Sequence, residues 1–218
     1  MDNKTIINYY VNYYVDKNED RQQEIDYCIE KNINNTYITD IYCIGTLIDL
    51  HVFTKRHSMT QKIHIVMNDN RPKFSDFFKL INKYTGQNDI NIFSNTDIYF
   101  DDSLKYVNNY LTNNTTCLAL SRWDILNLEK NDIEHHDVNW SQDTWIFKGF
   151  VKSETIGNFY LGLWMCDSIL LKELLDNGYK VHNPSKTIKT YHLHCSNIRN
   201  YDRNNPVEGL VAYLEPSN

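Results

Sequence analysis

Short apolar runs alternate with amphipathic segments through the first half of the chain. Three runs rich in Ile, Val and Tyr predict strands, at residues 5–15, 38–48 and 62–67. Apolar residues at helical spacing predict a helix over 20–33, and a second helix begins at Pro72 and ends before Gly86. This alternation predicts right-handed crossovers and a mostly parallel central sheet with helices on both faces, an α/β fold.

The second half of the chain is less regular. A helix is expected around Leu104 to Leu111, and another from about Ser168, with Asp167 at its N-cap and Asn177-Gly178 as its stop. The remaining apolar runs predict further extended segments, at 115–123, 140–149, 155–162 and 180–195. We expect the runs at 140–149 and 155–162 to belong to a smaller mixed sheet.

Composition and charge narrow the class of protein. With 218 residues, 41% of them hydrophobic, and only 7 Gly and 4 Pro, the chain is expected to form a single globular domain over 1–218. Its net charge is −6 and its basic residues are dispersed, which argues against a nucleic-acid partner. The 5 Cys lack metal-ligand spacing and favour a reducing compartment. We find no secretory signal and no membrane span, so we expect a soluble, cytoplasmic protein.

Polar oxygens cluster where the strand around Ile92 ends. Asn95 and Asp97 follow that strand directly, and Asp101 and Asp102 come next. In open α/β sheets ligands bind beyond the carboxyl ends of strands, and hard divalent cations take carboxylate and amide oxygens. Asp101 or Asp102 is also explained as the cap of a helix beginning near Ser103. Asn95 and Asp97 precede any such cap, so capping does not account for them.

Several local patterns in order resemble one enzyme family. These are RQQEID, NDNRPKFSDFF, NTDIYFDDS, LSRWD, QDTWIF, LGLWMCDSIL, GYKVHNPS and YHLH. Together they resemble GT-A-type glycosyltransferases, with the nearest likeness to compact glycosyltransferase domains of large DNA viruses and some bacteria. The resemblance implies a Rossmann-like fold with a nucleotide-binding half at 1–115 and an acceptor-binding half at 116–218. A viral protein would then act in the host cytoplasm.

The resemblance also implies a metal site. In this family an Asp-x-Asp motif holds Mn²⁺ or Mg²⁺ against the diphosphate of a nucleotide-sugar, and here Asn95-Thr96-Asp97 stands in its place. The amide of Asn95 supplies an oxygen but no charge, which leaves Asp97 as the main carboxylate. A late histidine commonly completes the site. His192 and His194 point the same way on an extended segment, and of the two we favour His194 as the ligand.

A glycosyl transfer also needs a base and groups that bind the donor. The family places the base before a helix in the second half, where Asp167 lies, and Asp143 is its rival. Other candidates contact the nucleotide-sugar or close over it, at Arg71, Arg122, Trp123 and Arg199. A surface ion pair is the alternative explanation for Arg122.

These observations predict a metal-dependent hexosyltransferase, with an inverting outcome favoured. It would move a sugar from a nucleoside-diphosphate sugar, with UDP favoured by the resemblance, to a hydroxyl of a glycan or other acceptor. One alternative is a non-catalytic carbohydrate-binding module of the same fold. A sugar nucleotidyltransferase is less favoured, because the N-terminal region has no Gly-rich phosphate loop.

Overall fold

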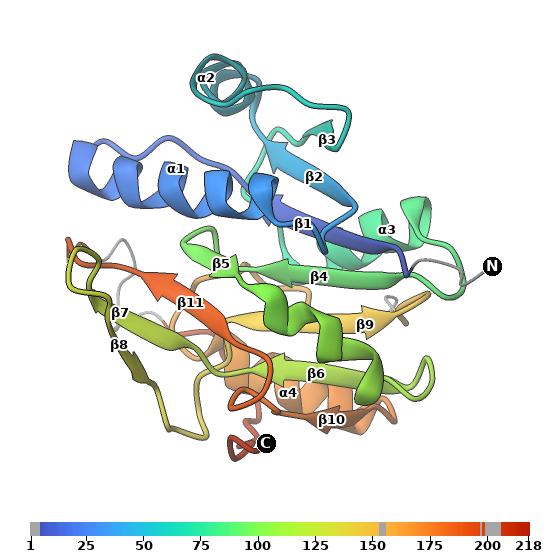
Figure 1. Cartoon of the computed structure of the whole chain (residues 1–218). Helices are drawn as coiled ribbons and strands as arrows, with labels where there is room; N and C mark the ends of the chain where they lie inside the picture. The colour runs from blue at the N-terminus through green and yellow to red at the C-terminus, as the bar shows by residue number, and fades with distance from the viewer. Residues whose placement is uncertain (1–4, 153–155, 197, 199–205) are drawn as a thin grey trace.

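A computed structural model of the chain describes residues 5–152, 156–196, 198 and 206–218. Its centre is a seven-stranded sheet with the order β10-β6-β9-β4-β1-β2-β3 (Figure 1). The strands of this sheet are β1 (Ile7–Asn12), β2 (Asp40–Gly45), β3 (Ile63–Met67), β4 (Ile90–Ser94), β6 (Thr116–Leu120), β9 (Thr144–Lys148) and β10 (Lys180–His182). The predicted α/β fold with a mostly parallel central sheet is therefore confirmed.

The direction of β9 decides which residues meet at one edge of this sheet. β9 is antiparallel to both of its neighbours, β4 and β6, whereas β1, β2, β3 and β4 pair in parallel. The carboxyl ends of the parallel strands therefore lie at the same edge as the amino end of β9. Asn95, which follows β4, meets Asp143, which precedes β9, and the Asn95 amide donates to the Asp143 carbonyl at 3.1 Å.

Helices cover both faces of the sheet. One apolar cluster joins it to α1 (Glu19–Asn34), α2 (Leu47–Arg56) and the 3₁₀ helix η1 (Asp102–Asn109). The other cluster joins it to α3 (Phe74–Tyr84) and α4 (Cys166–Asp176), and Figure 1 shows these two helices behind the sheet. The side chain of Asp101 accepts a hydrogen bond from the Ser103 amide at 2.8 Å, so it caps η1 as the sequence predicts.

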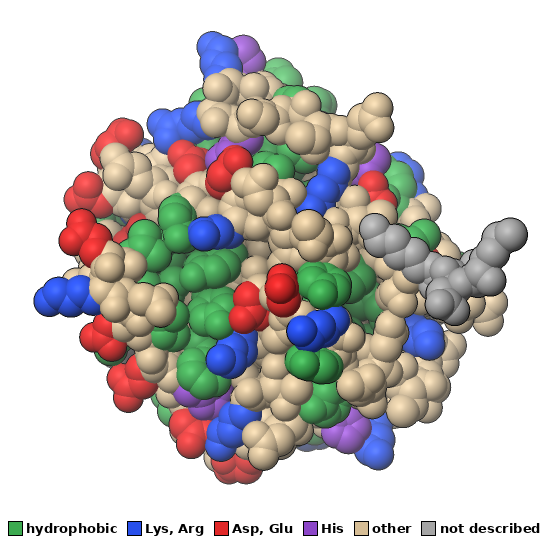
Figure 2. All heavy atoms as spheres, in the orientation of Figure 1, with side chains coloured by type: hydrophobic (Ala, Val, Ile, Leu, Met, Phe, Trp, Pro, Cys, Tyr) green, Lys and Arg blue, Asp and Glu red, His purple; other side chains and the backbone are tan. Residues whose placement is uncertain are grey.

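A second, four-stranded sheet has the order β5-β11-β7-β8. Its strands are β5 (Ile98–Phe100), β7 (Trp123–Asn127), β8 (Asp132–His135) and β11 (Thr190–Leu193). β11 runs parallel to β7 and antiparallel to β5, so the sheet is mixed. Hydrophobic side chains gather over β5 and β11 on the face in Figure 2, where the rings of Tyr99 and Tyr191 stack with centroids 5.0 Å apart.

Four details differ from the elements predicted. The strand at 38–48 ends at Gly45, because the Thr46 hydroxyl caps a helix, α2. The run at 140–149 is β9 of the central sheet, and the smaller sheet contains the hairpin β7–β8 instead. Residues 156–162 form turns with one isolated bridge, not a strand. α4 begins at Cys166, so Asp167 lies in its first turn and Met165 is the N-cap.

None of the helices among the described residues is both long and apolar enough to cross a lipid bilayer.

Candidate active site

A cavity of about 960 Å³ opens at the carboxyl edge of the central sheet. Its wall contains eight of the residues singled out from the sequence, namely Arg71, Asn95, Asp97, Arg122, Asp143, Asp167, His192 and His194. They come from distant parts of the chain, on loops after β3, β4 and β6, before β9, at the start of α4, and on β11 or just after it. The fold therefore brings the predicted metal, donor and base candidates into one cavity.

Trp123 is the predicted residue that the structure describes outside that wall. The indole of Trp123 donates to the Ser185 carbonyl at 2.8 Å, and the Lys189 ammonium lies 4.6 Å from the centroid of its ring. Trp123 therefore packs against the segment 185–189 and is absent from the cavity lining. Arg199 lies outside the described residues. Arg71 is in the wall, where its guanidinium donates to the Leu161 carbonyl.

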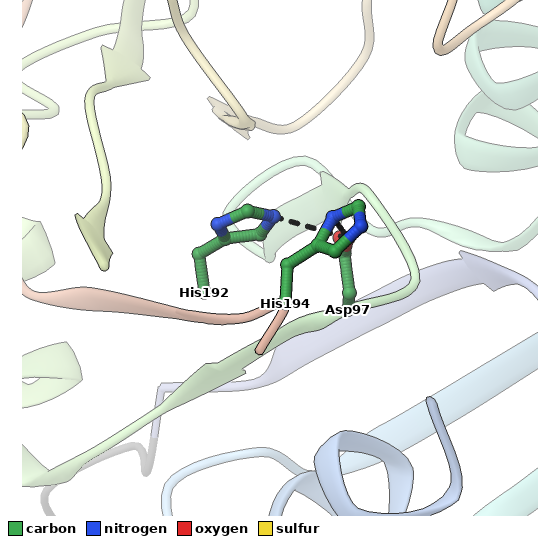
Figure 3. Close-up of side chains that lie close together, drawn as sticks. All are labelled: Asp97, His192 and His194. Atoms are coloured by element: carbon green, nitrogen blue, oxygen red, sulfur yellow. Dashed lines mark hydrogen bonds and ion pairs between the residues drawn. The ribbon is translucent and has the colours of Figure 1, made fainter. Parts of the chain in front are cut away.

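Asp97, His192 and His194 form a compact cluster of metal-ligand type (Figure 3). One ligand atom from each of the three lies within 4.8 Å of the others. Both imidazoles approach the same carboxylate oxygen, Asp97 Oδ2, with His192 Nε2 at 3.1 Å and His194 Nδ1 at 3.7 Å. His192 lies on β11 and His194 one residue beyond its end, and both side chains lie on the Asp97 side, as the sequence predicts.

Asp97 is ionised in this setting. It is only 6% exposed, and burial alone would raise the pKa of its carboxyl. The positive charges of His192 and Arg21 outweigh burial and hold the pKa of Asp97 well below its usual range. The Arg21 guanidinium donates to Asp97 Oδ2, while Asp97 Oδ1 is buried with no hydrogen-bond partner among the described residues.

The two histidines differ in protonation, because the pKa of His192 is raised and that of His194 is lowered. His192 lies between two carboxylates, with Nδ1 2.7 Å from Asp124 Oδ1 and Nε2 facing Asp97. Burial lowers the pKa of His192, but Asp97 and Asp124 outweigh it and raise that pKa to about 9. Burial and the charge of Arg21 lower the pKa of His194. Because His194 Nε2 donates to the Ile198 carbonyl at 2.7 Å, its Nδ1 presents a lone pair toward Asp97.

These residues fit a divalent cation. Asp97 Oδ1 is a buried carboxylate oxygen with no hydrogen bond among the described residues, and an unpartnered buried oxygen is costly unless something binds it. His194 Nδ1 faces the other oxygen of the same carboxylate, Oδ2, at 3.7 Å. Asp124 holds Nδ1 of His192 in the manner of the carboxylate that orients a ligating histidine. Asn95 donates its amide hydrogen to Asp143 Oδ1 at 2.8 Å, which leaves its oxygen as the atom able to ligate.

A second group of charges surrounds Asp143. Arg122 Nη1 lies 2.9 Å from Asp143 Oδ2, and Arg122 Nε lies 2.7 Å from Asp124 Oδ1. Both oxygens of Asp143 therefore accept hydrogen bonds, one from Arg122 and one from Asn95. Arg122 is a largely buried bridge between two carboxylates, which replaces the surface ion pair considered from the sequence.

Asp167 has a different environment. Met165 adopts a left-handed conformation with φ of 69°, and this turn starts α4 so that Asp167 lines the cavity. Burial and the nearby negative charge of Asp143 raise the pKa of Asp167 to about 8. Among the described residues, its hydrogen-bond partner is the Cys166 thiol, at 3.2 Å from Oδ1. Asp167 is thus a carboxyl that changes protonation near neutral pH.

Aromatic side chains line the cavity beside Asp167. Trp140 is 47% exposed, and its ring centroid lies 6.5 Å from that of Trp164. The C-terminal segment 206–218 runs along this side, where the Ala212 amide donates to the Ser168 carbonyl at 3.0 Å. Tyr213 of this segment also lines the cavity and is 62% exposed. Flat, exposed rings of this kind offer faces on which an apolar or sugar surface can stack.

The structure adds three site residues to which sequence reasoning gave no role. Arg21 and Glu24 are buried on α1, and Asp124 lies on β7. Arg21 stands four residues before Ile25 and seven before Cys28, so it shares their apolar stripe. A charged residue on such a stripe usually has a buried partner, which was the available signal. Asp124 gave no comparable signal, because it lies in an ordinary alternating strand.

Comparisons with known proteins support the fold. No protein-family model and no curated protein matches the sequence. A mannosyltransferase from Pyrobaculum calidifontis, solved with GDP-Man and Mn²⁺, matches at TM-score 0.56 and 12% identity, over 92% of this chain and 59% of that one. GalNAc-T7, solved with UDP, GalNAc and Mn²⁺, matches at TM-score 0.56 and 9% identity, over 89% of this chain and 45% of that one.

A third match is to another kind of enzyme. A 4-diphosphocytidyl-2C-methyl-D-erythritol synthase from Anaerococcus prevotii matches at TM-score 0.50 and 12% identity, over 92% of each chain. The chain spans about half the length of the mannosyltransferase and of GalNAc-T7. At these identities the likeness concerns the fold, and together with the strand order it shows that the chain has a GT-A-type, Rossmann-like fold.

Proposed function

We propose that the protein is a metal-dependent glycosyltransferase that uses a nucleoside-diphosphate sugar. The observation that carries the proposal is the Asp97–His192–His194 cluster, which lies in the same cavity as a carboxyl with a pKa of about 8. A glycosyl transfer to a hydroxyl needs both parts, a cationic site for the diphosphate and a base for the acceptor. Two glycosyltransferases that share the fold, the mannosyltransferase and GalNAc-T7, were solved with Mn²⁺.

The donor would bind along the carboxyl edge of the central sheet, within the half formed by residues 1–115. Asp97, His192 and His194 would hold Mn²⁺, or Mg²⁺ in its place, with the Asn95 oxygen beside them. The bound ion supplies Lewis-acid stabilisation of the leaving diphosphate. Arg71 lines the same cavity and offers a further positive charge to the phosphates. UDP and GDP, the nucleotides seen with the two matched glycosyltransferases, are the first donors to test.

Asp167 is the better of the two base candidates. Both carboxylate oxygens of Asp143 already accept hydrogen bonds, from Arg122 and Asn95, so Asp143 has little capacity to take a proton. Within the described part of the chain, Asp167 accepts a hydrogen bond only from the Cys166 thiol. Its pKa of about 8 matches the value that general-base catalysis favours near neutral pH. Asp167 would accept the proton of the acceptor hydroxyl while the hydroxyl oxygen bonds to the anomeric carbon and the bond from that carbon to the diphosphate breaks. The nucleoside diphosphate would leave from the opposite side, so the transfer would invert the anomeric carbon.

The aromatic side of the cavity supports a sugar as the acceptor. Trp140, Trp164 and Tyr213 lie in the same wall as Asp167, formed by residues after position 115. Their rings offer faces for the C–H surface of a sugar while leaving hydroxyls free to reach the base. We therefore assign this side of the cavity to a glycan acceptor.

The test is calorimetric titration of the protein with UDP, GDP and their sugars, with Mn²⁺ and with EDTA. We expect one nucleotide to bind only when Mn²⁺ is present. We expect Asp97→Asn to abolish this Mn²⁺-dependent binding. This variant keeps the shape of the side chain, so Arg21 is not left beside an empty space. Absence of nucleotide binding in folded wild-type protein would exclude the transferase and favour the carbohydrate-binding module.

A nucleotidyltransferase is the second candidate, because one enzyme that transfers a cytidylyl group shares the fold over 92% of both chains. Such an enzyme binds a nucleoside triphosphate and releases pyrophosphate. The chain from β1 to β2 contains no glycine before Gly45, so it has no glycine-rich phosphate loop there. Pyrophosphate release from a triphosphate and a sugar phosphate would favour this candidate, and hydrolysis or transfer from a diphosphate-sugar would favour ours.

A further inference from the structure

Arg21 occupies an unusual place, because a permanent positive charge touches the main carboxylate of the metal cluster. Arg21 lies on the first turns of α1, is 4% exposed, and donates from Nη2 to Asp97 Oδ2. That oxygen is the same one that both His192 and His194 approach. A cation held by the cluster would therefore sit close to the guanidinium.

Arg21 is also held firmly in this place. Its Nη1 donates to Glu24 Oε2 at 2.9 Å and to the Leu193 carbonyl at 3.1 Å. Glu24 is fixed in turn by the backbone amide of Ser196 at 2.6 Å. Acceptors on both sides of the guanidinium and little solvent exposure therefore hold Arg21 beside Asp97. A divalent cation entering the cluster would therefore be repelled by the positive charge of Arg21.

We propose that Arg21 makes metal binding depend on the nucleotide. Arg21 already neutralises Asp97, so a divalent cation entering alone gains little from that carboxylate and is repelled by the guanidinium. A nucleoside diphosphate brings several negative charges, which attract both the cation and Arg21. The cation and the nucleotide therefore bind together, with affinities that increase each other by the same factor. This inference rests on the metal site of the proposed function.

The test measures Mn²⁺ affinity directly, by electron paramagnetic resonance of the free ion, with and without UDP or GDP. In the wild type, the nucleotide that binds should tighten Mn²⁺ binding at least tenfold, after correction for Mn²⁺ bound by nucleotide alone. Arg21→Met should tighten Mn²⁺ binding without nucleotide at least tenfold and shrink the effect of the nucleotide. Arg21→Lys keeps a positive charge and should remain close to the wild type.

The sign of the change separates this role from a structural one. Loss of packing around Asp97 would weaken Mn²⁺ binding in both variants, whereas loss of a repelling charge strengthens it in Arg21→Met alone. Unchanged or weaker Mn²⁺ binding in folded Arg21→Met would overturn the inference. If that variant does not fold, equal Mn²⁺ affinity of the wild type with and without nucleotide overturns it. No Mn²⁺ binding under any condition would instead refute the proposed metal site.

Discussion

Asp167 gives the sharpest prediction about catalysis. As the base it acts only when ionised, and burial together with the charge of Asp143 raises its pKa to about 8. Because the folded pKa is raised, the carboxyl is mostly protonated below that value and becomes ionised as the pH rises through it. The rate of transfer should therefore rise with pH through about 8 and level off above about pH 9.

The structure sets the size of these effects. With a pKa of about 8, roughly one tenth of Asp167 is ionised at pH 7 and nine tenths at pH 9, so kcat should rise by nearly tenfold between them. Asp167→Asn removes the base and should lower kcat by about 10²–10⁴-fold without changing nucleotide affinity. Asp143→Asn removes the neighbouring negative charge, so the pKa of Asp167 should fall and the rising limb should move to lower pH.

The assay follows nucleotide release at saturating donor and acceptor between pH 5.5 and 9.5, with Mn²⁺ present throughout. Nucleotide binding, measured separately, controls for damage to the donor site. Two results would refute the assignment. One is an Asp167→Asn variant that keeps more than a tenth of the wild-type kcat. The other is an Asp143→Asn variant that loses activity at every pH while Asp167→Asn retains it.

Three further predictions concern the acceptor site, the fold and Trp123, which lies outside the cavity lining. Trp140→Ala should raise the KM for acceptor roughly fivefold, from the loss of about 1 kcal/mol of ring contact, and leave donor affinity unchanged in calorimetry. Gly157→Ala should lower the free energy of unfolding, measured by urea titration, by about 1–3 kcal/mol or more. The reasons are a φ of +74° at Gly157 and an added Cβ that would lie 2.5 Å from Phe74 Cβ. Gly178→Ala, with φ of +82° and open space around it, should show the smaller cost of backbone strain alone. Trp123→Phe should leave nucleotide and acceptor kinetics unchanged, and a loss of either would place Trp123 in the site after all.

The central sheet was predictable because strand and helix patterns alternate regularly through the first half. α2 was missed because Leu47 and Ile48 extend the apolar run of β2, although they are 68% and 75% exposed. The strand ends and α2 begins at Thr46, whose hydroxyl accepts a hydrogen bond from the Asp49 amide at 3.3 Å. Apolar residues normally indicate burial, so hydrophobic pattern alone places these two in the strand.

The place of β9 could not be predicted from its pattern. Four of its five residues are buried, which is consistent with any central strand, in either direction and in either sheet. Its antiparallel insertion between β4 and β6 is what brings Asp143 to the carboxyl edge. Long-range pairing of this kind depends on the whole topology, and no local signal in residues 144–148 reports it.

The metal cluster was predictable in part, for reasons of local geometry. Asp97 follows a strand, and His192 and His194 alternate along another, so their directions follow from the pleat. Arg21 is 76 residues from Asp97 in sequence, and only the packing of α1 against β5 and β11 brings the two together. The sequence therefore indicated which residues could bind a cation, but not the charge already beside them.

Three aspartates in one cavity acquire different chemistry from their neighbours. Asp97 is kept ionised by Arg21 and His192, and Asp143 is engaged by Arg122 and Asn95 at both oxygens. Asp167 has burial and a like charge nearby, which raise its pKa instead. All three are the same residue type at the end of an element, so sequence could nominate them but not divide the roles. The division follows from the positions of Arg21 on α1 and Arg122 after β6. Each of these permanent positive charges keeps one carboxylate ionised and engaged, so Asp167 is the aspartate that remains able to exchange a proton.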